Sequence, residues 1–384
     1  MKVGVDATGW TFRRGYGRFL RNALGHLVEL DPETTYVLYV DESCAAAALP
    51  AGARRRGVRL TSRPVPDQTR PLRDVVRLTR AVRRDALDAF LFPAVYGYLP
   101  LLRVPTVVGV HDLIATDLPE LAMPTRRARL SWRLKERLAV RGATVLFTVS
   151  EGSRAAIARR FGLPEGQIGV VPEAPDPVFE SRGDEEVAAA RASVGLAPDE
   201  PYLVYAAGIS AHKNVETLLE ALAGVATEGS PPPRLVLAGD LDDNPFLSIA
   251  QRLRGEVVRL GLEERVLFPG FVSDDVLAAL YTGAVAAVVT SLAEGFGLPA
   301  IEAAACGAPA ILSDLPSHRE SLGDAALYFP ARDAAALRDH LVRVVSDEEL
   351  RRSLGSRGRQ AVARLTWDAS ARRLRELVRR AVDE

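Results

Sequence analysis

Two glutamates lie on either side of a glycine-rich turn in the segment 293–311, AEGFGLPAIEAAACGAPAI. Glu294 precedes the turn, and Glu302 follows it in an apolar helix that we expect to begin at Pro299, after a short buried strand at 284–291. The unpaired backbone N–H groups at the N-terminus of such a helix can bind a diphosphate. Because a carboxylate among alanines needs a partner, Glu302 suits the diol of a ribose. The pattern therefore predicts a sugar-nucleotide site.

This segment resembles the retaining family-4 glycosyltransferases of GT-B fold, whose signature is a pair of glutamates around a GFGLP turn. The resemblance implies that Glu294 and the turn residues Phe296, Gly297 and Leu298 meet the transferred sugar and the diphosphate, and that Glu302 holds the ribose. The residues alone leave an alternative open, with an exposed loop acid at 294 and a helix acid paired with an arginine at 302.

The length and composition indicate two cytoplasmic domains. A chain of 384 residues with 48% hydrophobic content is too long for one ordinary core and fits two domains of ~180 residues. With Cys44 and Cys306 as its only cysteines it has no disulfide framework, and Cys306 is expected in the core. The N-terminus enters a strand without a basic-then-apolar leader, and no apolar stretch approaches ~20 residues.

The charge is zero overall but uneven along the chain. Residues 1–180 hold 27 Lys and Arg against 19 Asp and Glu, and residues 181–384 hold 22 against 30, giving +8 and −8. The basic half suits an anionic acceptor or peripheral contact with the inner face of a membrane. The overall neutrality, without a basic stripe interleaved with aromatic residues, argues against nucleic acid as a partner.

Short apolar runs alternate with helix-length segments in both halves, which is typical of α/β domains with parallel sheets. A segment rich in proline and acids, 170–186, separates the two series. We expect two Rossmann-like β/α/β domains, 1–178 on the acceptor side and 179–365 on the nucleotide-sugar side. The resemblance implies that a last helix in 366–384 returns to the first domain, and that the two domains face each other across a cleft.

Ligands of open α/β sheets bind beyond the carboxyl ends of the strands, and two motifs of the first half follow strands in this way. Gly15 and Gly17 bracket a turn into a helix, and with Arg18 they are similar to the family's G-x-G-R loop, which approaches the diphosphate and the acceptor. His111, before Asp112, is similar to the family's active-site histidine that contacts the donor sugar. From the residues alone, a tight turn without a ligand and a structural histidine are equally open.

Two further motifs follow strands of the second half. Lys213 stands where a helix begins and is one of three lysines against 46 arginines, so a compact charge facing an anion is indicated. The family's second cation would fall near Gly208, where this chain has none, and Arg18 or a C-terminal arginine is left to replace it. Phe271 and Val272 follow the next strand, where relatives contact the nucleobase; a core position for Phe271 is the alternative.

Two other segments carry chemistry of a different kind. Asp240 and Asp242 form a D-x-D similar to the metal site of another glycosyltransferase fold, but a solvated turn is favoured, and no metal is expected. The segment 126–141 carries seven cations and one acid around a tryptophan and several leucines. It either lies on an anionic membrane or, as we favour, connects elements with its apolar stripe against the domain.

The resemblance runs from Gly15 to Trp367 and implies transfer of a sugar from a nucleotide diphosphate sugar to a hydroxyl acceptor, with retention and without a metal or other cofactor. His111, Glu294 and Lys213 would act on the sugar and the diphosphate. GDP-mannose is the favoured donor, followed by UDP-sugars, and the acceptor is a sugar, a lipid-linked molecule or a small molecule, with surface polysaccharide or glycolipid as the product.

Two alternatives remain open from the sequence, a sugar-nucleotide epimerase of the same fold and a non-catalytic sugar-nucleotide or glycan-binding protein. A dehydrogenase is disfavoured, because the first strand–helix turn lacks a compact G-x-G-x-x-G.

Overall fold

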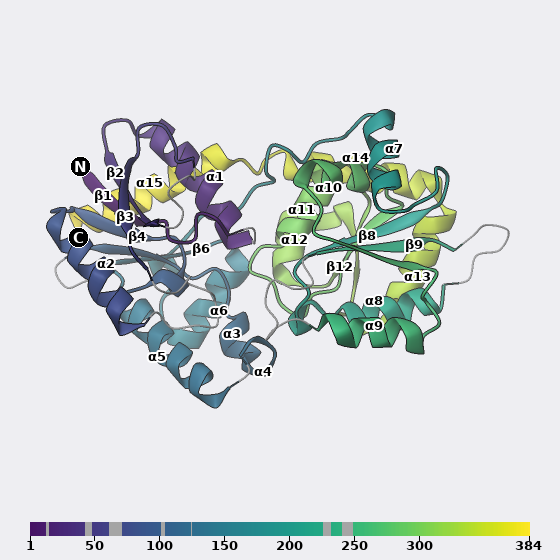
Figure 1. Ribbon diagram of the computed structural model, residues 1–384, viewed down its shortest axis with the longest axis horizontal. Helices are drawn as coiled ribbons and strands as arrows, with labels where there is room; N and C mark the ends of the chain where they lie inside the picture. Colours follow the sequence, from purple (N-terminus) through teal and green to yellow (C-terminus); the bar gives the residue numbers. More distant parts are fainter. Residues whose placement is uncertain are drawn as a thin grey trace. The chain divides into compact units, whose positions relative to one another are not determined.

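The computed structural model describes residues 1–12, 15–42, 48–60, 71–100, 104–123, 125–225, 232–239 and 249–384. These residues form two compact units, one made of Met1–Glu173 with Thr366–Glu384 and the other of Ala174–Leu365. The boundary between the two units therefore follows Glu173, whereas the sequence suggested a boundary near residue 178. Each unit is a parallel sheet covered by helices (Figure 1). This architecture confirms the expected α/β class with two Rossmann-like units.

The first unit contains a sheet of seven strands in the order β3-β2-β1-β4-β5-β6-β7, with every neighbouring pair parallel. Its strands are β1 (Lys2–Asp6), β2 (Thr35–Asp41), β3 (Arg54–Val58), β4 (Ala89–Phe92), β5 (Thr106–Gly109), β6 (Val145–Thr148) and β7 (Ile168–Val170). Its α-helices are α1 (Gly15–Leu30), α2 (Leu72–Arg84), α3 (Ile114–Asp117), α4 (Pro119–Ala122), α5 (Arg126–Gly142), α6 (Glu151–Phe161) and α15 (Trp367–Asp383), with 3-10 turns η2 (Val95–Gly97) and η3 (Glu165–Gln167).

Helices cover both faces of this sheet. From β1 to β3 the chain moves towards one edge of the sheet, and from β3 to β7 it moves towards the other edge. Because crossovers between parallel strands are right-handed, this reversal places α1 on one face and α2, α5 and α6 on the other. The last helix, α15, packs beside α1 (Figure 1). Thr366 caps α15 by accepting a hydrogen bond from Ala369 N at 3.2 Å. Leu374 and Val378 of α15 are buried, whereas Val382 is exposed.

The second unit contains a sheet of six strands in the order β10-β9-β8-β11-β12-β13, again with every neighbouring pair parallel. Its strands are β8 (Tyr202–Ala206), β9 (Arg234–Ala238), β10 (Val266–Gly270), β11 (Ala286–Val289), β12 (Ala310–Ser313) and β13 (Ala326–Phe329). Its helices are α7 (Asp184–Ser193), α8 (Val215–Ala223), α9 (Ala250–Arg259), α10 (Asp274–Thr282), α11 (Leu298–Ala305), α12 (Pro316–Leu322), α13 (Ala334–Ser346) and α14 (Glu348–Val362), with 3-10 turns η4 (Ala211–Lys213) and η5 (Gly323–Ala325).

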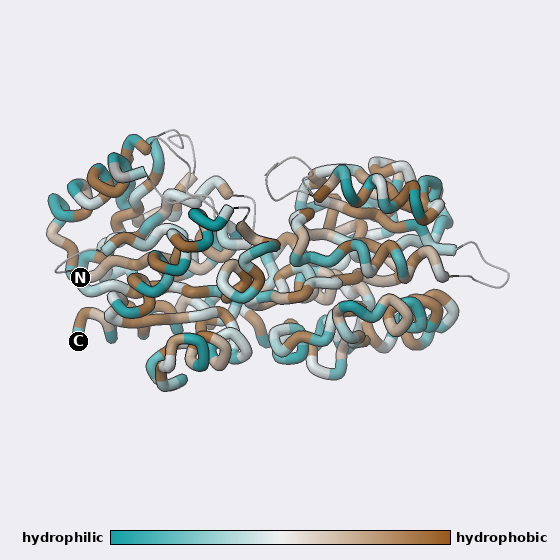
Figure 2. Tube along the Cα trace, turned by 90° about the horizontal axis from the view of Figure 1, so that it is seen from below, coloured by the Kyte–Doolittle hydropathy of each residue, from teal (hydrophilic) through white to brown (hydrophobic). Residues whose placement is uncertain are grey.

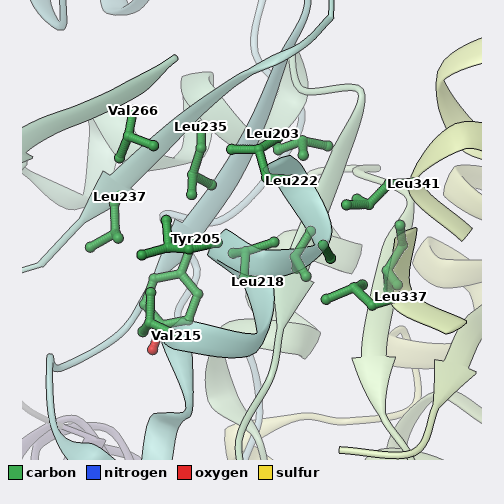
Figure 3. Packing of buried hydrophobic residues seen from close by; sticks show 14 of the residues in the cluster. Leu203, Tyr205, Val215, Leu218, Leu222, Leu235, Leu237, Val266, Leu337 and Leu341 are labelled. Atoms are coloured by element: carbon green, nitrogen blue, oxygen red, sulfur yellow. The ribbon is translucent and has the colours of Figure 1, made fainter. Parts of the chain in front are cut away.

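The core of the second unit has a layer on each face of its sheet. Leu203 and Tyr205 of β8 point to one face, where α8 and α13 pack with Leu218 and Leu337 (Figure 3). The alternate residues of β8 join the layer under α7 and α10 on the other face. In Figure 2, brown apolar segments run through the interior of both units, and the helices around them alternate between brown and teal residues. This is the pattern expected of buried parallel strands covered by amphipathic helices. In the described part of the chain, no helix is long and apolar enough to span a bilayer.

Candidate functional site

The strand order of the second unit reverses at β8, which lies between β9 and β11. Such a reversal leaves a crevice at the carboxyl ends of the two central strands, where α/β sheets bind their ligands. Lys213 follows β8 and Glu294 follows β11. Their side chains meet there, with Lys213 Nζ 2.6 Å from Glu294 Oε1. Two residues that are far apart in the chain thus form one ion pair at the switch point of the sheet.

A local hydrogen-bond network fixes Lys213 at this edge. The turn η4 ends at Lys213, and Asn214 then adopts a left-handed conformation, with φ 53°, before α8 begins. Asn214 Nδ2 donates to the carbonyl oxygens of Thr290, at 3.2 Å, and Ala331, at 2.6 Å. Thr290 Oγ1 in turn donates to Lys213 O at 2.8 Å. The backbone that carries the lysine is therefore tied directly to the end of β11.

Glu294 is an ionised carboxylate in this environment. Burial alone would raise its pKa, but the charge of Lys213, the nearby His318 ring and the Ser291 hydroxyl, which donates to Oε1 at 2.6 Å, lower the pKa to about 2. At neutral pH the carboxylate can accept hydrogen bonds and can orient a bound hydroxyl group. It has no proton to donate.

His318 of α12 belongs to the same cluster, although no motif in the sequence marks it. The ring is fully buried, and its Nδ1 lies 2.8 Å from Ser313 O, so Nδ1 carries the proton and donates. Burial lowers the pKa of His318, which leaves Nε2 as an acceptor, and among the described residues Nε2 has no hydrogen-bond partner. A Cβ added to Gly297 would lie 2.8 Å from the His318 ring, so the ring packs directly against the glycine turn.

The glycine turn places the start of α11 beside this cluster. Gly297 has φ 100°, a conformation that favours glycine, and Pro299 occupies the first turn of the helix, as predicted. Phe296 and Leu298 are buried in the core. Glu302 is also buried, with 4% of its surface exposed. The Glu294 side chain is 10% exposed, so the alternative of an exposed loop acid at that position is wrong.

Cys306 lies one turn beyond Glu302 and is a free, buried thiol. Burial, with the nearby Glu302 charge, raises the pKa of Cys306 to about 12. This confirms its expected place in the core; Cys44 lies outside the described residues.

The residues expected beside a nucleobase follow β10. Phe271 is exposed over 52% of its surface, whereas Val272 is partly buried and packs against the core. The alternative interpretation of Phe271 as a core residue is therefore wrong. An exposed aromatic ring at the carboxyl edge of the sheet offers a flat apolar face to a ligand.

In the first unit, the glycine loop differs from the expected turn. Gly15 begins α1 and Gly17 lies within its first turn, so the two glycines do not bracket a turn that precedes the helix. Gly17 is required by close packing, because an added Cβ would clash with the carbonyl group of Phe12. Arg18 follows on the same helix and is partly buried.

His111 follows β5 and is held in an aromatic cluster of the first unit. Its Nε2 donates to Pro93 O at 2.8 Å, and its ring stands edge-on to Phe19 with centroids 4.7 Å apart. Burial lowers the pKa of His111 to about 4, so the ring is neutral at physiological pH. The His111 Nδ1 atom lies 3.8 Å from Glu173 Oε1, but a neutral ring forms no ion pair with this carboxylate. This geometry is compatible with both the donor-sugar role and the structural alternative.

The expected site residues thus fall into two sets, one on each unit. The first unit carries Gly15, Gly17, Arg18 and His111, and the second carries Lys213, Phe271, Val272, Glu294, Phe296, Gly297, Leu298 and Glu302. Among the described residues, no group of three His, Cys, Asp or Glu side chains is arranged to hold a metal ion. Asp240 and Asp242 lie outside those residues.

Two family models match the chain. The model of glycosyltransferase family 4 matches residues 13–178, and that of glycosyl transferases group 1 matches residues 186–361. The O-antigen chain mannosyltransferase B of Escherichia coli is 28% identical over 74% of this chain and 72% of its own length.

Solved structures show the same fold at low sequence identity. Sucrose-phosphate synthase from Thermosynechococcus elongatus has a TM-score of 0.79 with 21% identity, over 99% of this chain and 98% of that one. HepE of Anabaena, solved in complex with UDP-glucose, has a TM-score of 0.74 with 19% identity over 98% of both chains. Two matched models that together span both units, a paired-glutamate turn at the switch point and this shared fold lead to one conclusion: the chain belongs to the family-4 glycosyltransferases of GT-B fold.

Proposed function

We propose that this glycosyltransferase moves a sugar from a nucleotide diphosphate sugar to a hydroxyl acceptor, with retention at the anomeric carbon and without a metal ion. The observation that carries the proposal is the Lys213–Glu294 pair, 2.6 Å between charged atoms, beside the start of α11 at the switch point of the second unit. A cation and free helix amides suit a diphosphate, and an ionised acid suits sugar hydroxyl groups.

Each part of the donor has a matching feature on the second unit. The diphosphate would lie at the start of α11 with Lys213 as its cation, and the ribose diol would donate to Glu302. The base would lie against Phe271, whose ring is exposed. Glu294 would accept hydrogen bonds from the transferred sugar, while Lys213 would attract both this carboxylate and the phosphate groups.

In the proposed reaction, the bond between the anomeric carbon and the phosphate oxygen breaks, and the acceptor oxygen forms a new bond on the same face of the sugar. The proton of the acceptor hydroxyl passes to the departing phosphate oxygen, so no protein acid or base is required. Lys213 and the amides of α11 stabilise the charge that develops on the diphosphate. Glu294, with its pKa near 2, orients the sugar as a fixed anion. His111 would contact the donor sugar as a neutral ring.

GDP-mannose is the proposed donor, and a UDP-sugar is the second candidate. The E. coli relative is named a mannosyltransferase, and the Anabaena structure contains UDP-glucose. We propose a cytoplasmic protein that acts on a sugar, a lipid-linked molecule or a small hydroxyl compound in surface polysaccharide or glycolipid synthesis. The +8 charge of residues 1–180 supports contact with an anionic membrane surface.

A thermal-shift panel tests this proposal with GDP, UDP, ADP, dTDP and their sugars, each with and without EDTA. A ligand that binds only the folded protein adds ~2.7 kcal/mol at a hundredfold excess over Kd, which raises the midpoint by several degrees. We expect GDP or UDP to raise the midpoint with EDTA present, and Glu302→Ala to abolish the shift because two charge-assisted hydrogen bonds to ribose are lost.

Three outcomes would contradict parts of the proposal. A shift that required Mg²⁺ or Mn²⁺ would overturn metal independence and direct attention to Asp240 and Asp242. No shift with any nucleotide would favour a glycan-binding protein, and conversion of the donor to an isomer without an acceptor would favour an epimerase.

A further inference from the structure

Helix α5, Arg126–Gly142, exposes a row of leucines that its sequence led us to place against the domain. Leu130, Leu134 and Leu138 are exposed over 70%, 59% and 49% of their surfaces. Their spacing of four residues places them along one side of the helix. The expectation that the apolar stripe of this helix packs on the domain is therefore wrong for all three leucines.

The opposite side of α5 is fixed to the first unit by polar contacts as well as by packing. Glu136 and Trp132 are buried, and both bind the hydroxyl group of Thr116. Thr116 Oγ1 donates to Glu136 Oε2 at 2.6 Å and accepts from Trp132 Nε1 at 3.1 Å. Lys135 donates to the carbonyl oxygen of Tyr96. A rotation that buried the leucines would break all of these bonds and would expose the tryptophan.

The exposed side of α5 is also strongly cationic. Its exposed arginines are Arg126, Arg127, Arg133, Arg137 and Arg141. At 100° per residue, these five and the three leucines occupy one continuous half of the helix surface. The single acid of the helix, Glu136, is buried on the other side. Among the described residues, no ion pair is formed by any of the five arginines.

Neighbouring α2 extends the positive charge on the same face of the sheet. Topology and the view in Figure 1 place α2 and α5 on the same side of the first sheet, away from α1 and α15. The exposed arginines of α2 include Arg73, Arg77, Arg80 and Arg84.

This combination of leucines and unpaired arginines selects among partners. A second copy of the chain in a twofold contact would bring two identical sets of arginines together, which repel each other. An anionic bilayer offers the complementary surface, with negative headgroups for the arginines and acyl chains for the leucines.

We propose that α5 is a membrane-docking helix, which inserts Leu130, Leu134 and Leu138 between the headgroups of an anionic bilayer while its arginines bind the lipid phosphates. The purpose of this docking rests on the proposed function, since it would bring the enzyme to a lipid-linked acceptor. The docking itself needs no nucleotide, so the two proposals can fail separately.

Cosedimentation of the full chain with vesicles tests the proposal, using equal parts phosphatidylglycerol and phosphatidylcholine, with pure phosphatidylcholine as the neutral comparison. The intact protein should bind the anionic vesicles, and binding should fall as salt rises. The triple variant Arg133→Gln, Arg137→Gln, Arg141→Gln should bind about a hundredfold more weakly, since each arginine near such a surface contributes about fivefold. The triple variant Leu130→Gln, Leu134→Gln, Leu138→Gln keeps every charge and should bind at least tenfold more weakly.

A matched control removes the same charge from the opposite face, with Arg372→Gln, Arg373→Gln and Arg380→Gln on α15. This variant should keep most of the vesicle binding. The unfolding midpoint of every variant without ligand shows whether the chain is folded. Its nucleotide-induced shift, which reports on the second unit, shows separately whether the donor proposal holds.

Several results would overturn the docking proposal. They are the absence of binding to anionic vesicles at low salt, an equal loss in the α15 control, and leucine variants that bind like the intact protein. A concentration-dependent dimer that the leucine substitutions abolish, seen by sedimentation equilibrium, would assign the face to a second copy instead.

Discussion

At the level of single residues, two buried titratable side chains have opposite charge states: the His111 ring is neutral and the Glu294 carboxylate is ionised. Burial lowers the pKa of His111 to about 4, because it outweighs the hydrogen bond to the Pro93 carbonyl, which favours the charged form. Glu294 is also buried, yet its pKa falls to about 2 because Lys213 and other partners stabilise the anion. The partner of each group, more than its depth, decides which form the fold prefers.

The depressed pKa of His111 predicts a pH-dependent stability. Between pH 4 and about pH 6.5 the unfolded chain binds a proton at this ring and the folded chain does not, so the free energy of unfolding falls as pH falls through this window. The loss is about 3 kcal/mol for a shift of this size. Urea unfolding at pH 7.5 and pH 4.5 should show a smaller difference in His111→Asn than in the intact protein.

His318, whose pKa burial also lowers, should contribute a further part of the slope. An unchanged pH dependence in His111→Asn would mean that the ring is not held in its neutral form.

Sequence patterns could locate Lys213 and Glu294, but not their contact with each other. Each residue follows an apolar strand, and the carboxyl ends of parallel strands meet at one edge, so proximity was predictable. His318 was not found, because its local sequence, LPSHRE, carries no chemical signal. Its place beneath Gly297 comes from the pairing of β11 with β12, which is a long-range property.

At the level of elements, the strand–turn–helix unit around Gly297 was predictable and α5 was not. Proline, glycine and an apolar strand mark the first by local rules. In α5, both sides carry apolar residues, and the buried side contains Glu136, against the usual exposure of acids. Strand β3 could not be predicted from an apolar run either, because it is mostly charged and exposed.

Gly297→Ala tests how tightly the turn is built. The added methyl group would occupy a backbone conformation with φ 100° and approach the His318 ring at 2.8 Å, so we expect a loss of about 2–4 kcal/mol in stability together with weaker nucleotide binding. Urea unfolding and the nucleotide thermal shift measure the two effects.

Gly261→Ala is the matched control in the same unit. Gly261 also has a positive φ, of 66°, but an added Cβ meets nothing within 4 Å. This variant should lose only about 1 kcal/mol and bind nucleotide normally. Equal effects of the two substitutions would show that backbone conformation alone, rather than the contact with His318, limits the turn.

At the level of the whole molecule, the chain builds one unit from two distant segments. Residues 366–384 leave the second unit and complete the first, where Arg379 pairs with Asp31 at 3.0 Å and His26 with Asp368 at 2.7 Å. The amphipathic pattern of α15 was readable in the sequence, but its destination came from the family resemblance. Local sequence does not specify which distant surface an amphipathic helix covers.

Leu374→Ala should destabilise the first unit selectively. Leu374 is 1% exposed in α15, and its truncation leaves a cavity that costs about 2–5 kcal/mol. Hydrogen exchange should show faster exchange of β1 and β4 amides, with β8 and β11 amides unchanged. Val382→Ala, at a more exposed position of the same helix, is the control and should have little effect. Equal loss of protection in both sheets would mean that the two units unfold as one block.

The placement of α15 also sets the order in which the protein can be completed during synthesis. A ribosome that has made residues 1–173 has made every strand of the first sheet, but the helix that covers α1 and part of that sheet is still almost two hundred codons away. The second unit is encoded without interruption and can close as soon as it emerges. The half of the enzyme that is translated first is therefore the half that is completed last, with apolar surface open to chaperones or to misassociation until residues 366–384 arrive.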